Sequence, residues 1–489
     1  MRIIRFRVRS LAALFILTLL LLPLGTASLA GAPTGAFVPT AFPAPPAGAG
    51  SATPIGPTSK AVLRLRKAIY ILPGICGSDL YADLDLSAGD LLERAPELTG
   101  IANPATRVDA GDSLWVPQSL HPLSALAMLA CGADGRPLMM VRTYSDPQTY
   151  GPLGIYQYLC LRLQDQLGGE YDVRFFPYDW RMDNFVAAQR LQESIAYAGY
   201  KEVILVAHSM GGLVASSFLA MSPANRAMVK QAYFIAVPFL GTPKTLYAAE
   251  TGNIFNMPLL RGMTSPDAKR TAANFRSIPE LLPTRRAFDL GVAPYVSVSG
   301  TVLSDYDSTA AFLRTLEDPG VNTSFLSDAE AFHRSLYLPG GEHAAAAVDS
   351  FFFSGVGRPV VHTVKYDAAG RMAGAEFSGS GDGTVPVWSS SLGVSLRASG
   401  NAGIMPDQVV YKNVSHFGFL LDVKTAGFII SRIRGGDPVP ADYGFATNAN
   451  QPEKDSDAVL DRLAQMFENG MLVLYLRSIM DKLVVSTFR

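Results

Sequence analysis

Residues 203–214 read Val-Ile-Leu-Val-Ala-His-Ser-Met-Gly-Gly-Leu-Val. The first five form an apolar, mostly β-branched run typical of a buried strand, and the residues after Ser209 are compatible with a helix. A serine at such a sharp turn is exposed, and it becomes a nucleophile when a histidine takes its proton. Small residues must flank it, as Ala207 and Gly211 do, although an alanine stands where the G-x-S-x-G pattern has glycine. The stretch predicts a nucleophile elbow at Ser209; the alternative is a buried strand and helix with an incidental serine.

Similar short apolar runs recur along the chain, most with Gly, Pro, Asp or Asn close by, as in the buried strands of a parallel sheet. They are Ile69–Leu72, Val173–Phe176, Tyr233–Val237, Tyr295–Val298 and Val409–Tyr411. Amphipathic stretches of helix length lie between several of them, at Gly154–Leu167 and Val186–Ala198. This alternation predicts an α/β fold with a doubly wound, mostly parallel sheet and helices on both faces. Ligands bind at the carboxyl ends of such strands, which is where Ser209 stands.

The order of residues along the chain selects partners for Ser209. In α/β hydrolases the acid and then the histidine follow the serine. The histidines after Ser209 are His333, His343, His362 and His416. His416 lies in a loop after the last predicted strand, whereas the others have strand-like, helix-like or Gly-rich surroundings. His416 is therefore the predicted base.

The acid must be a loop carboxylate that lies between serine and histidine in the sequence and holds the imidazole tautomer. Asp382 lies in Ser-Gly-Ser-Gly-Asp-Gly-Thr-Val-Pro, where glycines on both sides let the backbone bring its carboxylate close. Asp305 and Asp307 are weaker candidates. A plain surface turn is the alternative interpretation of the Gly-rich segment, which is not a phosphate loop because no Lys-Ser/Thr follows.

The sequence also offers backbone donors for an oxyanion. One is the N–H of the residue after the nucleophile, Met210, and the second comes from a loop after an early strand. The loop Leu72–Ser78 follows the first predicted strand and contains two glycines. Ile75 is the predicted second donor, with Cys76 possible instead; a plain tight turn is the alternative.

The composition fits one globular catalytic body with insertions. The chain has 489 residues, 48% of them apolar, and a net charge of −1, so nothing indicates nucleic-acid binding. We expect a catalytic domain over residues 60–445. Residues 81–141 and 240–294 do not fit the strand–helix alternation and are predicted cap or lid insertions, the alternative being that they enlarge the core.

The two ends of the chain differ from the body. Residues 1–30 have the basic start, apolar run and small residues of a signal peptide, which predicts a secreted or periplasmic protein; an uncleaved anchor is the alternative. Residues 31–59 are rich in Pro, Ala and Gly and predict a disordered linker. Residues 446–489 predict a helical extension that packs on the domain, with membrane contact as the alternative. In an oxidising compartment Cys131 and Cys160 are the favoured disulfide pair.

Taken together, the motifs resemble those of the lecithin:cholesterol acyltransferase family, which includes lysosomal phospholipase A2 and related bacterial lipases. The matching blocks are Pro73–Ser78, Tyr178–Arg181, Ala207–Gly212, Pro238–Pro243 and Gly381–Pro386. The resemblance implies an α/β-hydrolase fold with a cap and a membrane-facing lid. It also implies Ser209 as nucleophile, Asp382 as acid and His416 as base. The chain departs from the animal enzymes because residues 81–141 contain only Cys131 and so no clear lid disulfide.

The implied chemistry is transfer of an acyl group from an ester lipid, through an acyl-enzyme, to water or to an alcohol acceptor. Trp180 and Arg181 are predicted to line the acyl or head-group region, unless they belong to the core. The expected partners are ester lipids at a membrane or lipoprotein-like surface. No cofactor or metal is expected, because no cysteine or histidine pair has ligand spacing. A serine esterase or peptidase acting on a non-lipid polymer, and an inactive binding module, are the alternatives.

Overall fold

The computed structural model describes residues 67–99, 101, 107–115, 127–143, 150–253, 265–396 and 403–449. The predicted signal peptide (residues 1–30) and linker (residues 31–59) lie outside these ranges. So does the predicted C-terminal helical extension beyond residue 449. Within the described ranges, no helix is both long and apolar enough to cross a membrane.

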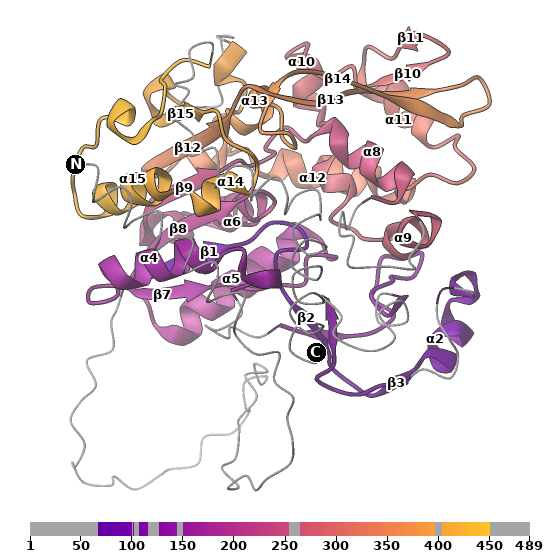
Figure 1. Cartoon of the computed structure of the whole chain (residues 1–489), viewed down its shortest axis with the longest axis horizontal. Helices are drawn as coiled ribbons and strands as arrows, with labels where there is room; N and C mark the ends of the chain where they lie inside the picture. Colours follow the sequence, from indigo (N-terminus) through magenta and orange to yellow (C-terminus); the bar gives the residue numbers. More distant parts are fainter. Residues whose placement is uncertain are drawn as a thin grey trace, which may run out of the picture. The chain divides into compact units, whose positions relative to one another are not determined.

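Six parallel strands form the central sheet (Figure 1). In spatial order they are β15 (Val409–Lys412), β12 (Ser350–Gly355), β9 (Val229–Ile235), β8 (Glu202–His208), β1 (Lys67–Leu72) and β7 (Asp172–Phe175). After β1 the chain adds β7 on one side of it, and then adds β8, β9, β12 and β15 in turn on the other side. The predicted doubly wound α/β fold is confirmed, and the point where the winding reverses lies between β1 and β8, the usual place for a ligand.

Helices cover both faces of this sheet. The elements α4 (Gln157–Leu167), α14 (Gly418–Leu421) and α15 (Val423–Ile433) pack on one face, and α5 (Asn184–Ala198) and α6 (Gly211–Met221) pack on the other. Side chains alternate along a strand, so Ile69 and Ile71 of β1 join the first cluster while Tyr70 and Leu72 join the second. Each large apolar side chain buried in this way stabilises the fold by roughly 1.5–3 kcal/mol.

One predicted strand belongs elsewhere. Residues Tyr295–Val298 contain β10 (Val296–Val298), but β10 lies in a separate four-stranded sheet with the order β11–β10–β13–β14. The position in the central sheet is taken by β12, whose sequence Ser-Phe-Phe-Phe-Ser-Gly lacks β-branched residues and was missed. Its phenylalanines serve both faces, because Phe352 packs with the α5 side and Phe353 with the α4 side.

Three segments are inserted between elements of the central α/β unit. The first, between β1 and α4, holds β2 (Leu80–Ala82), β3 (Leu86–Ser87), α2 (Ala88–Arg94), β4 (Arg107–Val108), β5 (Ser113–Trp115) and β6 (Val141–Arg142). The second, between β9 and β12, holds α8 (Pro243–Thr251), α9 (Ser265–Ala272), α10 (Arg285–Asp289), β10, β11 (Thr301–Val302), α11 (Tyr306–Leu313) and α12 (Leu326–Ser335). The third, between β12 and β15, holds β13 (Arg358–Tyr366), β14 (Met372–Gly381) and α13 (Val387–Ser390). The second insertion therefore runs well past the predicted limit of residue 294, and the third was not predicted.

The favoured disulfide between Cys131 and Cys160 is absent, and both residues are free thiols. Cys131 belongs to the core cluster that contains α5 and α6, whereas Cys160 on α4 belongs to the cluster on the opposite face. The sheet lies between the two clusters, so the sulfur atoms cannot meet. Burial raises the pKa of the Cys131 thiol to about 12, which keeps it protonated and unreactive at neutral pH.

We predict that thiol titration of the purified chain after unfolding in guanidinium gives three thiols per molecule, one for each cysteine. The folded protein should react far more slowly, because Cys131 and Cys160 are buried. A single titratable thiol, with an intact mass lowered by the hydrogens lost on oxidation, would show that a pair has formed.

Three buried histidines make stability depend on pH. Burial lowers the pKa of His333 to about 4 and of His343 to about 3, and it lowers the pKa of His208 well below the ordinary value. Below about pH 6.5 these histidines bind protons in the unfolded chain but remain neutral in the folded protein. The free energy of unfolding should therefore fall as pH drops from about 6.5 towards 4, by up to roughly 1.4 kcal/mol per pH unit for each histidine.

Denaturant unfolding at a series of pH values measures this slope. The substitution His343→Gln should make it shallower by about one proton, because it removes one of the buried imidazoles. An unchanged slope in a folded His343→Gln protein would contradict the assignment.

Candidate active site

Ser209 stands at the turn between β8 and α6. Its backbone has φ +53°, the left-handed region, which costs a residue other than glycine about 1–2 kcal/mol. Two hydrogen bonds hold the turn: Ser209 N–H donates to the Ile235 carbonyl at 2.9 Å, and Gly212 N–H donates to the Ser209 carbonyl at 2.9 Å. This strained turn between strand and helix has the geometry that the sequence predicted for a nucleophile elbow.

The small residues around Ser209 are required by close contacts. A Cβ on Gly211 would lie 2.5 Å from the carbonyl oxygens of Leu72 and Pro73. A Cβ on Gly74, in the loop after β1, would lie 2.8 Å from the Cβ of Ser209. Ala207 is a regular strand residue paired with Leu72, so its methyl group brings no strain at the position where the pattern has glycine.

Ser209, His416 and Asp382 are joined by two consecutive hydrogen bonds. His416 Nε2 is 3.0 Å from Ser209 Oγ, and His416 Nδ1 is 2.8 Å from Asp382 Oδ2. A carboxylate accepts, so Nδ1 carries the proton and Nε2 is left to accept the serine hydroxyl. All three residues are buried, with Ser209 the most exposed at 7%. The structure thus brings together the three residues selected by chain order.

Asp382 is held by more than the histidine. Its Oδ1 accepts hydrogen bonds from Thr384 N–H at 2.8 Å and Val385 N–H at 2.7 Å, which compensate for the burial of the carboxylate. Gly355, the last residue of β12, gives it room, since a Cβ there would lie 2.4 Å from the Asp382 Cβ. Asp382 therefore sits at the carboxyl end of β12 although it follows β14 in the chain.

The other candidates serve elsewhere. Asp305 caps α11, and Asp307 pairs with Arg285. His333 Nε2 donates to the Glu280 carbonyl at 2.6 Å, and His343 begins a short 3-10 helix at Ala344–Ala346. Neither these residues nor the exposed His362 contact Ser209 in any hydrogen bond that the described residues make.

A second histidine, which the sequence did not single out, supports the site. His208 Nε2–H donates to the His416 carbonyl at 3.1 Å, so its Nδ1 accepts from the Tyr156 hydroxyl at 2.9 Å. That hydroxyl accepts in turn from Gly74 N–H at 2.8 Å. Burial and the neighbouring His416 lower the pKa of His208 and keep it neutral. One hydrogen-bond chain thus ties the Gly74 loop, the end of β8 and the His416 loop.

The backbone N–H groups of the two predicted oxyanion donors are unused within the protein. Among the described residues, neither Met210 N–H nor Ile75 N–H donates a hydrogen bond. Ile75 and the alternative donor Cys76 form the central residues of a tight turn closed by Gly77 N–H to the Gly74 carbonyl at 3.0 Å. Both line the pocket that contains Ser209 and His416.

This pocket, which we call the Ser209 pocket, has a volume of about 180 Å³. Its walls are largely apolar and come from the Gly74 loop, the start of α4 and the second insertion; they include Ile155, Ile278, Leu281 and Phe417. Lys244 at the start of α8 lies on the wall and donates to Thr384 Oγ1 at 2.8 Å and to the Gly383 carbonyl at 3.2 Å. The described residues contain no group of three or more His, Cys, Asp or Glu side chains placed to hold a metal ion.

Trp180 and Arg181 lie in the packing and not on the wall of the Ser209 pocket. Trp180 Nε1–H donates to the Ser78 carbonyl at 3.1 Å, in the loop after β1. The Arg181 guanidinium pairs with Asp179 at 2.7 Å and donates to the Leu129 carbonyl at 3.0 Å. Both side chains are fully buried. They therefore belong to the core, which was the alternative, and not to the wall that a substrate would contact.

Comparison with known proteins finds a family that resembles the part of the chain around Ser209. The model of the family described as "Lecithin:cholesterol acyltransferase" matches residues 166–313, which include Ser209. The rat (Rattus norvegicus) protein "Lysosomal phospholipase A and acyltransferase" is 28% identical over 44% of this chain and 51% of its own length. The Arabidopsis thaliana protein "Lecithin-cholesterol acyltransferase-like 1" is 26% identical over 55% of this chain and 66% of its own.

The matched region spans about half the length of the rat relative. Among solved structures, one described as "The crystal structure of Tle4-Tli4 complex" aligns with 76% of this chain and 99% of its own, with TM-score 0.44 and 13% identity. Residues 166–313 of this chain are thus similar to the lecithin:cholesterol acyltransferase family, a likeness that extends to its rat and plant relatives over part of their length.

Proposed function

We propose that the protein is a serine acyltransferase or phospholipase that forms an acyl-enzyme on Ser209 from an ester lipid. The observation that carries the proposal is the continuous hydrogen-bonded line from Ser209 through His416 to Asp382, at 3.0 and 2.8 Å, on the wall of an apolar pocket. The similarity of residues 166–313 to a family with a relative named as a phospholipase and acyltransferase supports it.

The first step makes the acyl-enzyme. His416 Nε2 takes the hydroxyl proton as Ser209 Oγ attacks the ester carbonyl carbon. The carbonyl oxygen becomes an oxyanion within reach of the N–H groups of Met210 and Ile75. His416 then gives its proton to the alkoxide of the leaving group, and the carbon–oxygen bond breaks. Asp382 holds the imidazole and stabilises its charged form.

The second step releases the acyl group. His416 takes a proton from water or from an alcohol as that oxygen attacks the acyl carbon. Collapse of the second tetrahedral intermediate returns the proton to Ser209 and gives a fatty acid or a new ester. The acceptor that prevails depends on how well the insertions exclude water from the Ser209 pocket.

The walls of the pocket favour an acyl chain over a polar polymer. Ile155, Ile278 and Leu281 offer apolar contact, and Lys244 adds a positive charge to the wall. The signal-peptide composition of residues 1–30 supports a place of action outside the cytoplasm, at a lipid surface. Phospholipid is therefore the substrate class that we propose, with a non-lipid ester as the second candidate.

The direct test follows a labelled acyl chain. Purified protein incubated with vesicles of acyl-labelled phospholipid and sterol should produce labelled fatty acid or labelled sterol ester, detected by mass spectrometry. Ser209→Ala should lower the rate by roughly 10⁴- to 10⁶-fold with an unchanged thermal unfolding midpoint, because it removes only the nucleophile.

Two other outcomes are informative. Covalent labelling of Ser209 by a fluorophosphonate without any Ser209-dependent lipid product would overturn the lipid assignment and favour the non-lipid ester. No labelling at all in the folded protein would contradict the nucleophile itself.

The hydrogen-bond chain through Tyr156 gives a second prediction. Tyr156→Phe removes the hydroxyl that joins Gly74 N–H to His208 while keeping the buried ring. We expect kcat to fall about tenfold, equivalent to roughly 1.4 kcal/mol, with KM nearly unchanged. Active-site titration with a fluorophosphonate corrects for unfolded protein, so the loss is measured per active site.

Tyr158→Phe, the same substitution two positions along α4, is the matched control and should retain full kcat. If both variants lose kcat equally, or if the Tyr156 variant loses only active-site titre, then Tyr156 has a purely structural role.

A further inference from the structure

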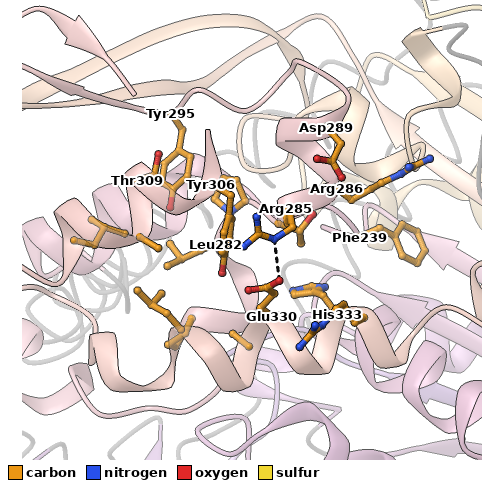
Figure 2. A pocket seen from close by; sticks show the side chains of 18 of the residues that line it. Phe239, Leu282, Arg285, Arg286, Asp289, Tyr295, Tyr306, Thr309, Glu330 and His333 are labelled. Atoms are coloured by element: carbon orange, nitrogen blue, oxygen red, sulfur yellow. Dashed lines mark hydrogen bonds and ion pairs between the residues drawn. The ribbon is translucent and has the colours of Figure 1, made fainter. Parts of the chain in front are cut away.

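A second cavity, larger than the Ser209 pocket, lies within the second insertion. It has a volume of about 370 Å³ and is lined by α10, α11, α12 and residues 279–284 (Figure 2). Leu282, Leu313 and Leu326 give it apolar walls. A cavity of this size and lining is in the range of sites that enclose small organic molecules.

The second cavity is separate from the Ser209 pocket but shares a wall with it. Ile278 and Leu281 line the Ser209 pocket, whereas Pro279, Leu282 and Pro283 line the second cavity. The segment 278–283 is therefore a partition one chain thick. None of Ser209, Asp382 and His416 lines the second cavity.

The charges at the second cavity are largely paired within the protein. Arg285 binds Asp307 through both terminal nitrogens, at 2.6 and 2.8 Å. Its Nε binds Glu330 at 2.9 Å, as Figure 2 shows. Its guanidinium also lies over the Tyr306 ring, 4.6 Å from the centroid. All three nitrogens of Arg285 thus donate to carboxylates of the protein itself. Arg334 also lines the cavity but is exposed, so water screens its charge.

The uncharged polar groups at the second cavity have unused hydrogen-bonding capacity. His333 is 8% exposed, and its Nε2–H donates to the Glu280 carbonyl at 2.6 Å, which leaves Nδ1 as an acceptor. Burial lowers the pKa of His333 to about 4, so Nδ1 stays unprotonated. Tyr295 is 3% exposed. Within the described ranges, neither His333 Nδ1 nor the Tyr295 hydroxyl has a hydrogen-bond partner.

We propose that the second cavity binds a neutral lipid that carries a free hydroxyl group. The alkyl part would lie against the leucines, and the hydroxyl would donate to His333 Nδ1. A carboxylate has no proton to donate to this acceptor, whereas an alcohol has one. The side chain of Glu330 also lines the cavity. His333 Nδ1 therefore favours an alcohol over a fatty-acid anion of equal length.

Photolabelling tests the proposal without any catalytic turnover. A 1-decanol analogue with a diazirine in its chain is irradiated with the full-length protein, and labelled peptides are identified by mass spectrometry. We expect label within residues 306–335, the α11–α12 region. Unlabelled 1-decanol should displace the analogue from these peptides at a concentration about tenfold lower than decanoate does, the equivalent of one hydrogen bond. Equal displacement by the two competitors, or label confined to peptides of the Ser209 pocket, would overturn the proposal.

A matched pair of variants on α12 locates the site. Ala329 lines the second cavity and is 6% exposed, whereas Ala331 is exposed on the same helix. Ala329→Phe should abolish labelling within residues 306–335, and Ala331→Phe should leave it intact. Unchanged labelling in a folded Ala329→Phe protein would also overturn the proposal. If that variant does not fold, the alcohol-against-carboxylate competition on the natural chain still decides. Neither measurement depends on Ser209 chemistry, so the second cavity and the proposed function can fail independently.

Discussion

The close packing of Gly74 against Ser209 is the constraint on which the site depends. The loop after β1 meets the turn after β8 so tightly that a Cβ at Gly74 would overlap the serine side chain. This contact brings the Gly74 loop next to the nucleophile. It exists because β1 and β8 are adjacent parallel strands, and the chain leaves them towards opposite edges of the sheet. The strain at Ser209 is tolerated because Ile235 and Gly212 fix the turn on both sides.

Much of the rest of the site serves to hold these loops. Tyr178 and Trp180 bind the backbone of the Pro73–Ser78 loop, and the Thr242 hydroxyl donates to the Thr384 carbonyl beside Asp382 at 2.7 Å. Tyr156 and His208 join the first loop to the histidine loop. Most of these contacts are made to backbone atoms. They set the positions of the loops, so that the reacting side chains need little reorganisation.

The sequence was sufficient to predict the strand–helix alternation and the residues Ser209, Asp382 and His416, because a tight elbow and Gly-rich loops have strict local requirements. It was not sufficient to predict packing between segments far apart in the chain. The three phenylalanines of β12 carry no periodic signal, since both faces of that strand are buried. Nothing in the sequence distinguishes Tyr156 from an ordinary helix residue, because its hydrogen-bond partner His208 lies 52 positions away. The sequence does not distinguish the core role of Trp180 and Arg181 from contact with a ligand, because an aromatic and a cation after a strand give the same pattern in both cases.

The bonds between Ser78 and the Tyr178–Trp180 segment also bear on how such a chain can be recombined. Tyr178 N–H donates to Ser78 Oγ at 3.0 Å, and Trp180 Nε1–H donates to the Ser78 carbonyl at 3.1 Å, across about a hundred residues of sequence. A chimera whose new segment lacks the serine at position 78 or the tryptophan at position 180 would lose one of these bonds, even if Ser209, Asp382 and His416 were retained. These two distant segments are therefore best exchanged together.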